Sequence, residues 1–178
     1  MDTTNAFSNL PLLTFLDVEA SGLQKPDSFP IEIGWADTLG NSDEFLIYPI
    51  DTWFHWDKQA EALHGITHTQ LLEAGISVID AACRLNDMLG VERVYCDALS
   101  FDGFWLDRLF KAAGMAPSFL LTDVFELYGA LGAELAEEMV RKLREIPATH
   151  RALEDAERYA AAYREVMAGY LMQQTKVE

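Results

Sequence analysis

The sequence predicts an α/β protein built on a mixed sheet. Its first third has the pattern of three strands, over residues 12–19, 31–36 and 43–48. The last two are separated by a short polar turn at residues 39–42, which favours a hairpin. Helical and strand patterns then alternate, and the chain ends in helices. We therefore expect an antiparallel meander of three strands within a mixed sheet that helices flank.

The middle of the chain carries signals for the starts and ends of helices. A short helix is predicted over residues 57–63 and stops near Gly65, and Thr67 begins another helical turn. Ser77 can cap a longer helix, because a serine side chain accepts a hydrogen bond from the first backbone amides. The buried face predicted for this helix consists of Val78, Ile79, Ala82, Leu85 and Leu89.

The second half alternates strand and helix before two final helices. Short strands are predicted over residues 93–98 and 119–122, with a helix over residues 101–113 between them. The final helices are predicted over residues 133–146 and 152–172. The first is predicted to bury Leu135, Met139, Val140, Leu143 and Ile146, and the second carries Ala156, Tyr159, Tyr163, Val166, Met167 and Tyr170 at helical spacing.

Size and composition indicate one folded domain. The chain has 178 residues, of which 50% are hydrophobic, so disorder is excluded as the main state. We expect a single domain over residues 1–178, with a core at about 10–172 and flexible termini. The net charge of −16 argues against proteins that coat a duplex or a membrane surface, because both use broad basic surfaces. A short nucleic-acid segment held through bound cations remains compatible with this charge.

The cysteines and the N-terminus indicate an intracellular protein. Cys83 and Cys96 form no CxxC pattern and are predicted to be reduced core residues. The two cysteines therefore do not favour a zinc site. Residues 1–9 show neither a basic region nor a long apolar segment, so we expect no signal peptide. No apolar run approaches the length of a membrane span. A cytoplasmic location is the resulting expectation.

Two carboxylates one residue apart end the first predicted strand. Side chains on a strand alternate between its faces, so Asp17 and Glu19 point the same way. Two acids on one face of a buried strand are costly unless a positive charge lies between them. Their oxygens suit Mg²⁺ or Mn²⁺. An acidic strand end that meets solvent is the alternative.

Two later segments bring further candidates to the ends of elements. Asp102 follows a strand and opens a helix, where it serves either a site at the sheet edge or the helix dipole. His150 lies at or just before the start of the last helix, and Asp155 falls in its second turn. A histidine on a loop can exchange a proton near neutral pH, although a histidine at a helix start can also have no such role.

Five segments in order carry a family resemblance. They are Asp17-Val18-Glu19-Ala20-Ser21-Gly22-Leu23, Ile31-Glu32-Ile33-Gly34, His64-Gly65-Ile66-Thr67, Phe101-Asp102, and His150 with Asp155. Together they resemble the DEDDh family of 3′–5′ exonucleases, over about residues 12–167. Each segment alone is weak evidence, whereas five in order at similar spacing are strong evidence. The length resembles that of a free-standing member.

The resemblance implies a fold, a reaction and a set of site residues. The fold would be ribonuclease H-like, with a five-stranded mixed sheet. Asp17, Glu19, Asp102 and Asp155 would hold two Mg²⁺ or Mn²⁺ ions, and His150 would be the general base that acts on the attacking water. The reaction would be hydrolysis of phosphodiester bonds from the 3′ end of RNA or DNA, with release of 5′-monophosphates.

The resemblance also implies contacts with the substrate. Ala20, Leu23, His64 and Phe101 match positions near the terminal nucleotides, and Leu23 would pack against the terminal base. The aromatic residues Trp53, Phe54 and Trp56 either contribute stacking or cover the sheet. Glu32, in an otherwise apolar strand, is expected to have a partner in the interior.

Some positions depart from the family pattern. Ala20 and Ser21 replace the usual threonines, and Ala98, with Asp97 beside it, replaces an asparagine that often precedes the second aspartate. These changes affect the expected substrate preference more than the metal ligands. A module that keeps this fold and binds nucleic acid or protein without cleaving it is therefore the alternative hypothesis.

The expected partner is single-stranded or short nucleic acid, either RNA or DNA, and no membrane is expected. A long polyanion would gain little affinity from counterion release on so acidic a protein. The last helix fits either its own sheet or a second copy of the chain, so a homodimer remains open.

Overall fold

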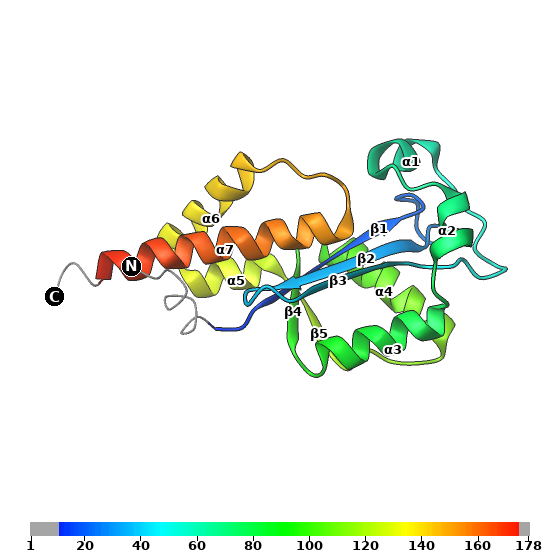
Figure 1. The fold of residues 1–178 in the computed structure, drawn as a ribbon, viewed down its shortest axis with the longest axis horizontal. Coiled ribbons are helices and arrows are strands. Elements are labelled where there is room, and N and C mark those ends of the chain that lie inside the picture. Colours follow the sequence, from blue (N-terminus) through cyan, green and yellow to red (C-terminus); the bar gives the residue numbers. More distant parts are fainter. Residues whose placement is uncertain (1–10, 175–178) are drawn as a thin grey trace.

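The computed structural model describes residues 11–174, which form a five-stranded mixed sheet flanked by helices (Figure 1). The strand order is β3-β2-β1-β4-β5, and the two pairings within the first three strands are antiparallel, whereas β1–β4 and β4–β5 are parallel. The predicted α/β class and the antiparallel meander are therefore confirmed. The strands are β1 (Thr14–Ala20), β2 (Pro30–Asp37), β3 (Ser42–Leu46), β4 (Arg93–Cys96) and β5 (Leu120–Asp123).

Helices cover both faces of this sheet. α3 and α4 lie on one face, and α5, α6 and α7 lie on the other, while α1 and α2 lie between β3 and α3 along the chain (Figure 1). The helices are α1 (Lys58–His64), α2 (His68–Ala74), α3 (Val78–Leu89), α4 (Leu99–Ala113), α5 (Val124–Leu131), α6 (Ala133–Glu145) and α7 (Ala152–Gln174). None of the helices in residues 11–174 is long and apolar enough to cross a membrane.

The alternation of side chains on β1 divides the core in two. Leu16 and Val18 belong to a large apolar cluster with α3 and α4, whereas Phe15 belongs to a second cluster with α5, α6 and α7. All eight residues of β2 are buried, because helices cover this interior strand on both faces. Asp17 and Glu19 share the face of Phe15, so both carboxylates face the side of the sheet on which α7 packs.

Several predicted turns and caps are confirmed. The Ser77 side chain accepts a hydrogen bond from the Asp80 backbone amide at 3.1 Å and caps α3. Gly65 and Gly114 follow α1 and α4 in left-handed conformations, with φ of 72° and 67°, which glycine adopts without a steric penalty. Asp37 stabilises the turn to β3 by accepting backbone hydrogen bonds from Leu39 and Asn41.

Helix α5 was not predicted. Its N-terminal residue follows β5 directly, and the Asp123 side chain caps it by accepting the Phe125 amide hydrogen at 2.9 Å. The sequence did hold a signal, because Asp123 and Glu126 have the spacing of an N-terminal helix cap. Gly129 weakens the helical pattern of this segment, and no loop separates the helix from β5, so the two elements were not distinguished in the sequence.

Three predictions of burial were wrong. Ile79 is 56% exposed, since the buried stripe of α3 runs through Ala81 and Ala82 instead. Ile146 is 39% exposed, because α6 ends at Glu145 before it. Cys83 is exposed on α3, whereas Cys96 is buried, and both thiols are free.

The expectation of flexible termini concerns the residues before about residue 10 and after about residue 172. Residues 1–10 and 175–178 lie outside the described part of the chain, so this expectation is not tested.

Candidate active site

The parallel pairing of β1 and β4 brings two aspartates side by side. Phe15 of β1 pairs with Tyr95 of β4. Two residues further along each chain, on the same face, lie Asp17 and Asp97. The carboxyl ends of β1 and β4 therefore present two carboxylates to the same region, which faces the start of α7.

Helix α4 contributes a third carboxylate. Asp102 lies in its first turn and is 2% exposed. The helix starts only three residues after β4, so its first turn remains at the carboxyl edge of the sheet. The Asp102 side chain accepts the Ala98 backbone amide hydrogen at 3.3 Å, which fixes it against the turn.

Helix α7 is held against the sheet by an ion pair to a buried glutamate and by a glycine. The guanidinium of Arg151 contacts both carboxylate oxygens of Glu32 on β2, at 2.6 to 3.1 Å, and the Ala152 amide donates to the same carboxylate at 3.0 Å. A Cβ on Gly34 would lie 2.1 Å from the Leu153 backbone nitrogen. The expected interior partner of Glu32 is thereby identified as Arg151.

The start of α7 also organises the loop that carries His150. The Asp155 carboxylate accepts the backbone amide hydrogens of Thr149 at 3.3 Å and of His150 at 2.9 Å. His150 has a φ of 57°, an uncommon value for a residue other than glycine. Asp155 lies in the first turn of α7 rather than in the second, as the helix begins only three residues before it.

The acidic and histidine side chains form two adjoining groups. One ligand atom from each of Glu19, His150 and Asp155 lies within 4.8 Å of the others. The same holds for Asp17, Asp97 and Asp102. A small cavity of about 10 Å³ is lined by Asp17 and Asp97 from one group and by Asp155 from the other, so the two groups adjoin.

The electrostatics of these acids are unfavourable without added positive charge. Burial, with the nearby Asp102 carboxylate as the next cause, raises the pKa of Asp17 well above its ordinary value. Burial and Glu32 raise the pKa of Glu19 to about 7, and burial and Asp97 raise that of Asp102 to about 8. Each of these carboxyl groups therefore loses its proton less readily than an ordinary Asp or Glu side chain, and a bound cation would oppose this shift.

The donor set fits divalent metal ions. Within residues 11–174, no hydrogen bond or ion pair satisfies the carboxylate of Asp17 or Glu19. The nearest guanidinium to Asp155 is that of Arg158, at 3.7 Å, and Arg151 is already paired with Glu32. Several carboxylates at ligand spacing, with too few cations of the protein nearby, are the donors that Mg²⁺ and Mn²⁺ prefer.

A groove of about 260 Å³ adjoins the acids. Three of the predicted substrate residues, Ala20, Leu23 and His64, line it together with Glu19. The fourth, Phe101, does not line the groove, but its ring centroid lies 5.5 Å from that of Trp105, which does. The exposed side chains of Leu23 and Leu63 lie at this groove, with 67% and 58% of their surfaces accessible.

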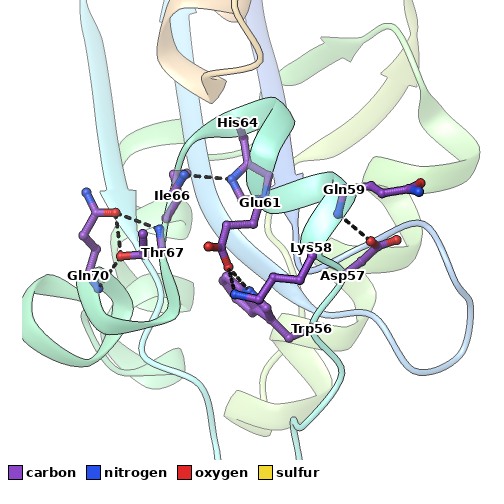
Figure 2. A network of polar contacts seen from close by, with 9 residues as sticks. All are labelled: Trp56, Asp57, Lys58, Gln59, Glu61, His64, Ile66, Thr67 and Gln70. Atoms are coloured by element: carbon purple, nitrogen blue, oxygen red, sulfur yellow. Dashed lines mark hydrogen bonds and ion pairs between the residues drawn. The ribbon is translucent and has the colours of Figure 1, made fainter.

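Helix α1 forms one wall of the groove and is stabilised by a polar network (Figure 2). Asp57 caps the helix by accepting the Gln59 amide hydrogen at 2.7 Å. Glu61 accepts hydrogen bonds from Trp56 Nε1 and from Lys58, the latter at 2.7 Å. The network fixes the helix that carries His64.

The ring of His64 is in a defined tautomer. Its Nδ1 accepts the Ile66 backbone amide hydrogen at 3.0 Å, as Figure 2 shows, so the proton of the neutral ring is on Nε2. Burial lowers the pKa of His64 and favours this neutral form. Nε2 is buried and has no hydrogen-bond partner within the described residues. His64 therefore lines the groove with a neutral ring whose Nε2–H group is itself buried.

The aromatic residues after β3 have separate roles. Trp53 is buried and stacks on Phe29 with ring centroids 5.1 Å apart, so it covers the sheet. Trp56 is half-buried and belongs to the network at α1, whereas Phe54 is 83% exposed.

The acidic residues and the histidine predicted for the site lie at one edge of the sheet. One further acid at this edge was not among the predicted site residues. The structure brings together Asp17, Glu19, Asp102, Asp155 and His150. The residue that the sequence analysis left out of the acidic group is Asp97. It directly follows a strand that pairs in parallel with β1, and this position at a strand end was the signal available in the sequence.

The family model described as an exonuclease, of the RNase T type, matches residues 14–163. No curated protein sequence matches the chain. Among solved structures, the zinc-bound complex of Escherichia coli exonuclease I with single-stranded DNA has a TM-score of 0.68 and 16% identity, and the match covers 91% of this chain and 43% of that chain. Exonuclease I from Methylocaldum szegediense gives a TM-score of 0.66 and 15% identity, over 91% of this chain and 43% of that chain.

The chain spans less than half the length of these exonuclease I chains, and at such identities the likeness shows the fold. The family match covers residues 14–163 and so includes all five strands of the sheet. The chain therefore belongs to the DEDDh exonuclease family, whose RNase T-type model matches it.

Proposed function

We propose that this chain is a metal-dependent 3′–5′ exonuclease that removes nucleoside 5′-monophosphates from the 3′ end of single-stranded RNA or DNA. The observation that carries the proposal is the convergence of Asp17, Asp102, Glu19, Asp155 and His150 beside an apolar groove. Membership of an exonuclease family supports the same reaction. The Escherichia coli exonuclease I structure is a complex with single-stranded DNA, which supports a single-stranded substrate here.

Four carboxylates would hold the metal ions. Asp17, Glu19, Asp102 and Asp155 are the proposed ligands of two Mg²⁺ or Mn²⁺ ions. When bound, such ions neutralise charge on the scissile phosphate and stabilise the leaving oxygen. The raised pKa values of Glu19, about 7, and Asp102, about 8, support the proposal, since they describe carboxylates that lack a cationic partner.

His150 is the proposed general base. Its side chain lies within 4.8 Å of ligand atoms of Glu19 and Asp155, and its backbone is held by the Asp155 carboxylate at 2.9 Å. The imidazole would take a proton from the attacking water as the new phosphorus–oxygen bond forms. The bond from phosphorus to the leaving 3′ oxygen breaks, and that oxygen gains a proton from solvent. The products are a 5′-monophosphate and a chain shortened by one nucleotide.

The groove is the proposed site for the terminal nucleotides. Leu23 and Leu63 offer apolar surface on which a base can stack without regard to its identity. His64 lines the groove as well, and its neutral ring would lie beside the terminal nucleotide. Ala20 lines the same groove, where a small side chain leaves room for the sugar.

Short substrates fit this groove better than long ones. Its lining includes the acids Glu19 and Asp57, and no lysine or arginine is among its lining residues in the described chain. The net charge of −16 also opposes a long polyanion. We expect similar or higher kcat/KM on 3-mers than on 30-mers of the same sequence. A strong preference for the 30-mer would contradict this substrate assignment.

An end-labelled digestion tests the proposed reaction. RNA and DNA oligonucleotides carrying a 5′ label would be incubated with the protein in Mg²⁺, in Mn²⁺ and in EDTA. The expected result is a metal-dependent ladder that shortens from the 3′ end. Asp17→Ala should abolish it, while Asp87→Ala, a change at an exposed aspartate of α3, should leave it intact.

A binding module without catalysis is the second candidate, and the departures at Ala20 and Ala98 from the family pattern motivate it. Oligonucleotide binding by the folded protein, with no product after long incubation in Mn²⁺, would favour this candidate and overturn the exonuclease proposal. If the Asp17→Ala variant gave the same ladder of products as the unchanged protein, the assignment of the site would also be overturned.

A further inference from the structure

Asp97 lies at the acidic site but has no counterpart among the four carboxylates expected from the family resemblance. One of its carboxylate oxygens lies within 4.8 Å of ligand atoms of Asp17 and Asp102. The parallel register of β1 and β4 accounts for this position, because Phe15 pairs with Tyr95 and the two aspartates follow at the same level. The location is therefore a consequence of the sheet and not of a chance loop conformation.

A tyrosine on α7 holds the Asp97 side chain toward the site. The Tyr159 hydroxyl donates a hydrogen bond to Asp97 Oδ2 at 3.1 Å. The ring of Tyr159 stacks on Phe15 with centroids 5.8 Å apart and an interplanar angle of 25°, which restricts the position of the hydroxyl. Tyr159 lies one helical turn after Asp155, so both side chains lie on the same face of α7.

The side chain of Asp97 is exposed to solvent, and its second carboxylate oxygen has no partner among the described residues. Over residues 11–174, no ion pair involves Asp97, and its only hydrogen bond is the one from Tyr159. Asp97 thus adds an accessible carboxylate, at ligand spacing, to the half-buried Asp17 and the buried Asp102. Asp17 itself has no cationic partner among the described residues, so the three carboxylates together can bind a divalent ion.

We propose that Asp97 is a fifth carboxylate of the metal centre, a ligand of the ion that Asp17 and Asp102 hold, and that Tyr159 is its positioning residue. This inference rests on the proposed function, since it concerns the same metal ions. The additional negative charge tightens the binding of that ion and, in the protein without metal, adds repulsion among the acids. Asp97 thus sets the metal affinity of this chain.

Binding of Mn²⁺ tests the inference without reference to catalysis. The affinity and the number of bound ions would be measured by isothermal titration and by electron paramagnetic resonance. Asp97→Asn should weaken the binding of one ion by about 10- to 100-fold. Tyr159→Phe removes one hydrogen bond and should weaken it by about two- to tenfold. Asp87→Asn, the matched control on α3, should bind as the unchanged protein does.

The melting temperature in EDTA provides a second measurement. Removal of Asp97 relieves repulsion, so Asp97→Asn should raise the melting temperature without metal and reduce the rise caused by Mn²⁺. A merely structural role of Asp97 predicts the opposite, a lower melting temperature in EDTA and an unchanged response to Mn²⁺. The variant Asp97→Ser, of smaller volume, would distinguish loss of the charge from an effect of the introduced amide.

The outcomes separate this inference from the proposed function. Unchanged Mn²⁺ affinity in Asp97→Asn, together with lost binding in Asp17→Asn, would overturn the role of Asp97 and leave the exonuclease proposal standing. Failure of the unchanged protein to bind Mn²⁺ at all would overturn both.

Discussion

At the scale of single residues, Asp155 links two parts of the candidate site. Its carboxylate is a proposed metal ligand, and it also accepts the backbone hydrogens of Thr149 and His150. The positive φ of His150, 57°, persists because these two hydrogen bonds hold the loop. Metal binding and the placement of the proposed base are therefore coupled through one side chain.

The role of His150 can be tested by its removal. His150→Ala should lower kcat by about 10²–10⁴, because the attacking water loses its general base. The measurement is the single-turnover rate on a short oligonucleotide in Mg²⁺, across a range of pH. His68→Ala, at an exposed histidine of α2, is the control and should retain the rate. A change below about threefold in His150→Ala would argue against this base.

The ion pair between Glu32 and Arg151 is a second testable feature at this scale. Arg151→Met leaves the Glu32 carboxylate, 2% exposed, without its guanidinium partner. The free energy of unfolding should fall by about 2–4 kcal/mol, slightly below the usual cost because Arg151 is 39% exposed and solvent can reach the site. Urea denaturation measures it.

An exposed ion pair provides the comparison for this variant. Arg93→Met breaks the contact with Glu126, in which both side chains are about half exposed, and should cost under about 1 kcal/mol. Equal losses in the two variants would show that burial does not determine the strength of the pair at Arg151.

At the scale of elements, the contact of α7 with β2 determines where the site forms. The absence of a side chain at Gly34 lets the first turn of α7 approach the strand, with a Cβ position only 2.1 Å from Leu153 N and 2.4 Å from the Ala152 carbonyl carbon. This turn carries Asp155 and follows the His150 loop. The glycine within the second strand is thus a requirement of helix packing and not of a turn.

The variant Gly34→Ala tests this packing. The added methyl group meets backbone atoms that cannot rotate away, so the free energy of unfolding should fall by about 3 kcal/mol. For a chain of this size, the melting temperature should fall by about 6–12 °C. Metal binding should weaken as well, because α7 shifts together with Asp155.

The glycine at position 169 supplies the matched control. Gly169 also lies in α7, but a Cβ there meets no atom within 4 Å. Gly169→Ala should stabilise the helix by about 0.5–1 kcal/mol. A melting temperature of Gly34→Ala that equals or exceeds that of Gly169→Ala would contradict the close approach of helix and strand.

At the scale of the whole molecule, stability should depend on both pH and metal. In the protein without metal, burial raises the pKa of Glu19 from 4.5 to about 7 and that of Asp102 from 3.8 to about 8. The native state then binds more protons than the unfolded state between about pH 4 and pH 8. The contribution of these groups to stability is present below about pH 4 and is lost as the pH rises through 7 and 8.

Divalent ions should offset this loss. The increase in melting temperature on replacing EDTA with Mg²⁺ should be larger at pH 8.5 than at pH 5.5, since at low pH protons compete for the same oxygens. Differential scanning fluorimetry at both pH values measures it, with Asp102→Asn as a variant in which the difference should shrink. An increase of equal size at both pH values would contradict the burial of these acids.

Local patterns in the sequence determined most of the elements and most of the candidate site. The alternation in β1, the cap at Ser77 and the stop at Gly114 depend on neighbouring residues alone, so they could be predicted. The acids and His150 could be identified because five short segments kept the order and spacing of a known family.

Only the tertiary structure decided what depends on register and on packing between distant segments. The pairing of β1 with β4 placed Asp97 beside Asp17, the approach of α7 to Gly34 placed Asp155, and Arg151 became the partner of Glu32 across 119 residues of chain. Such contacts follow from the joint packing of a sheet and its helices, in which each distance depends on all the others. No local pattern in the sequence contains that information.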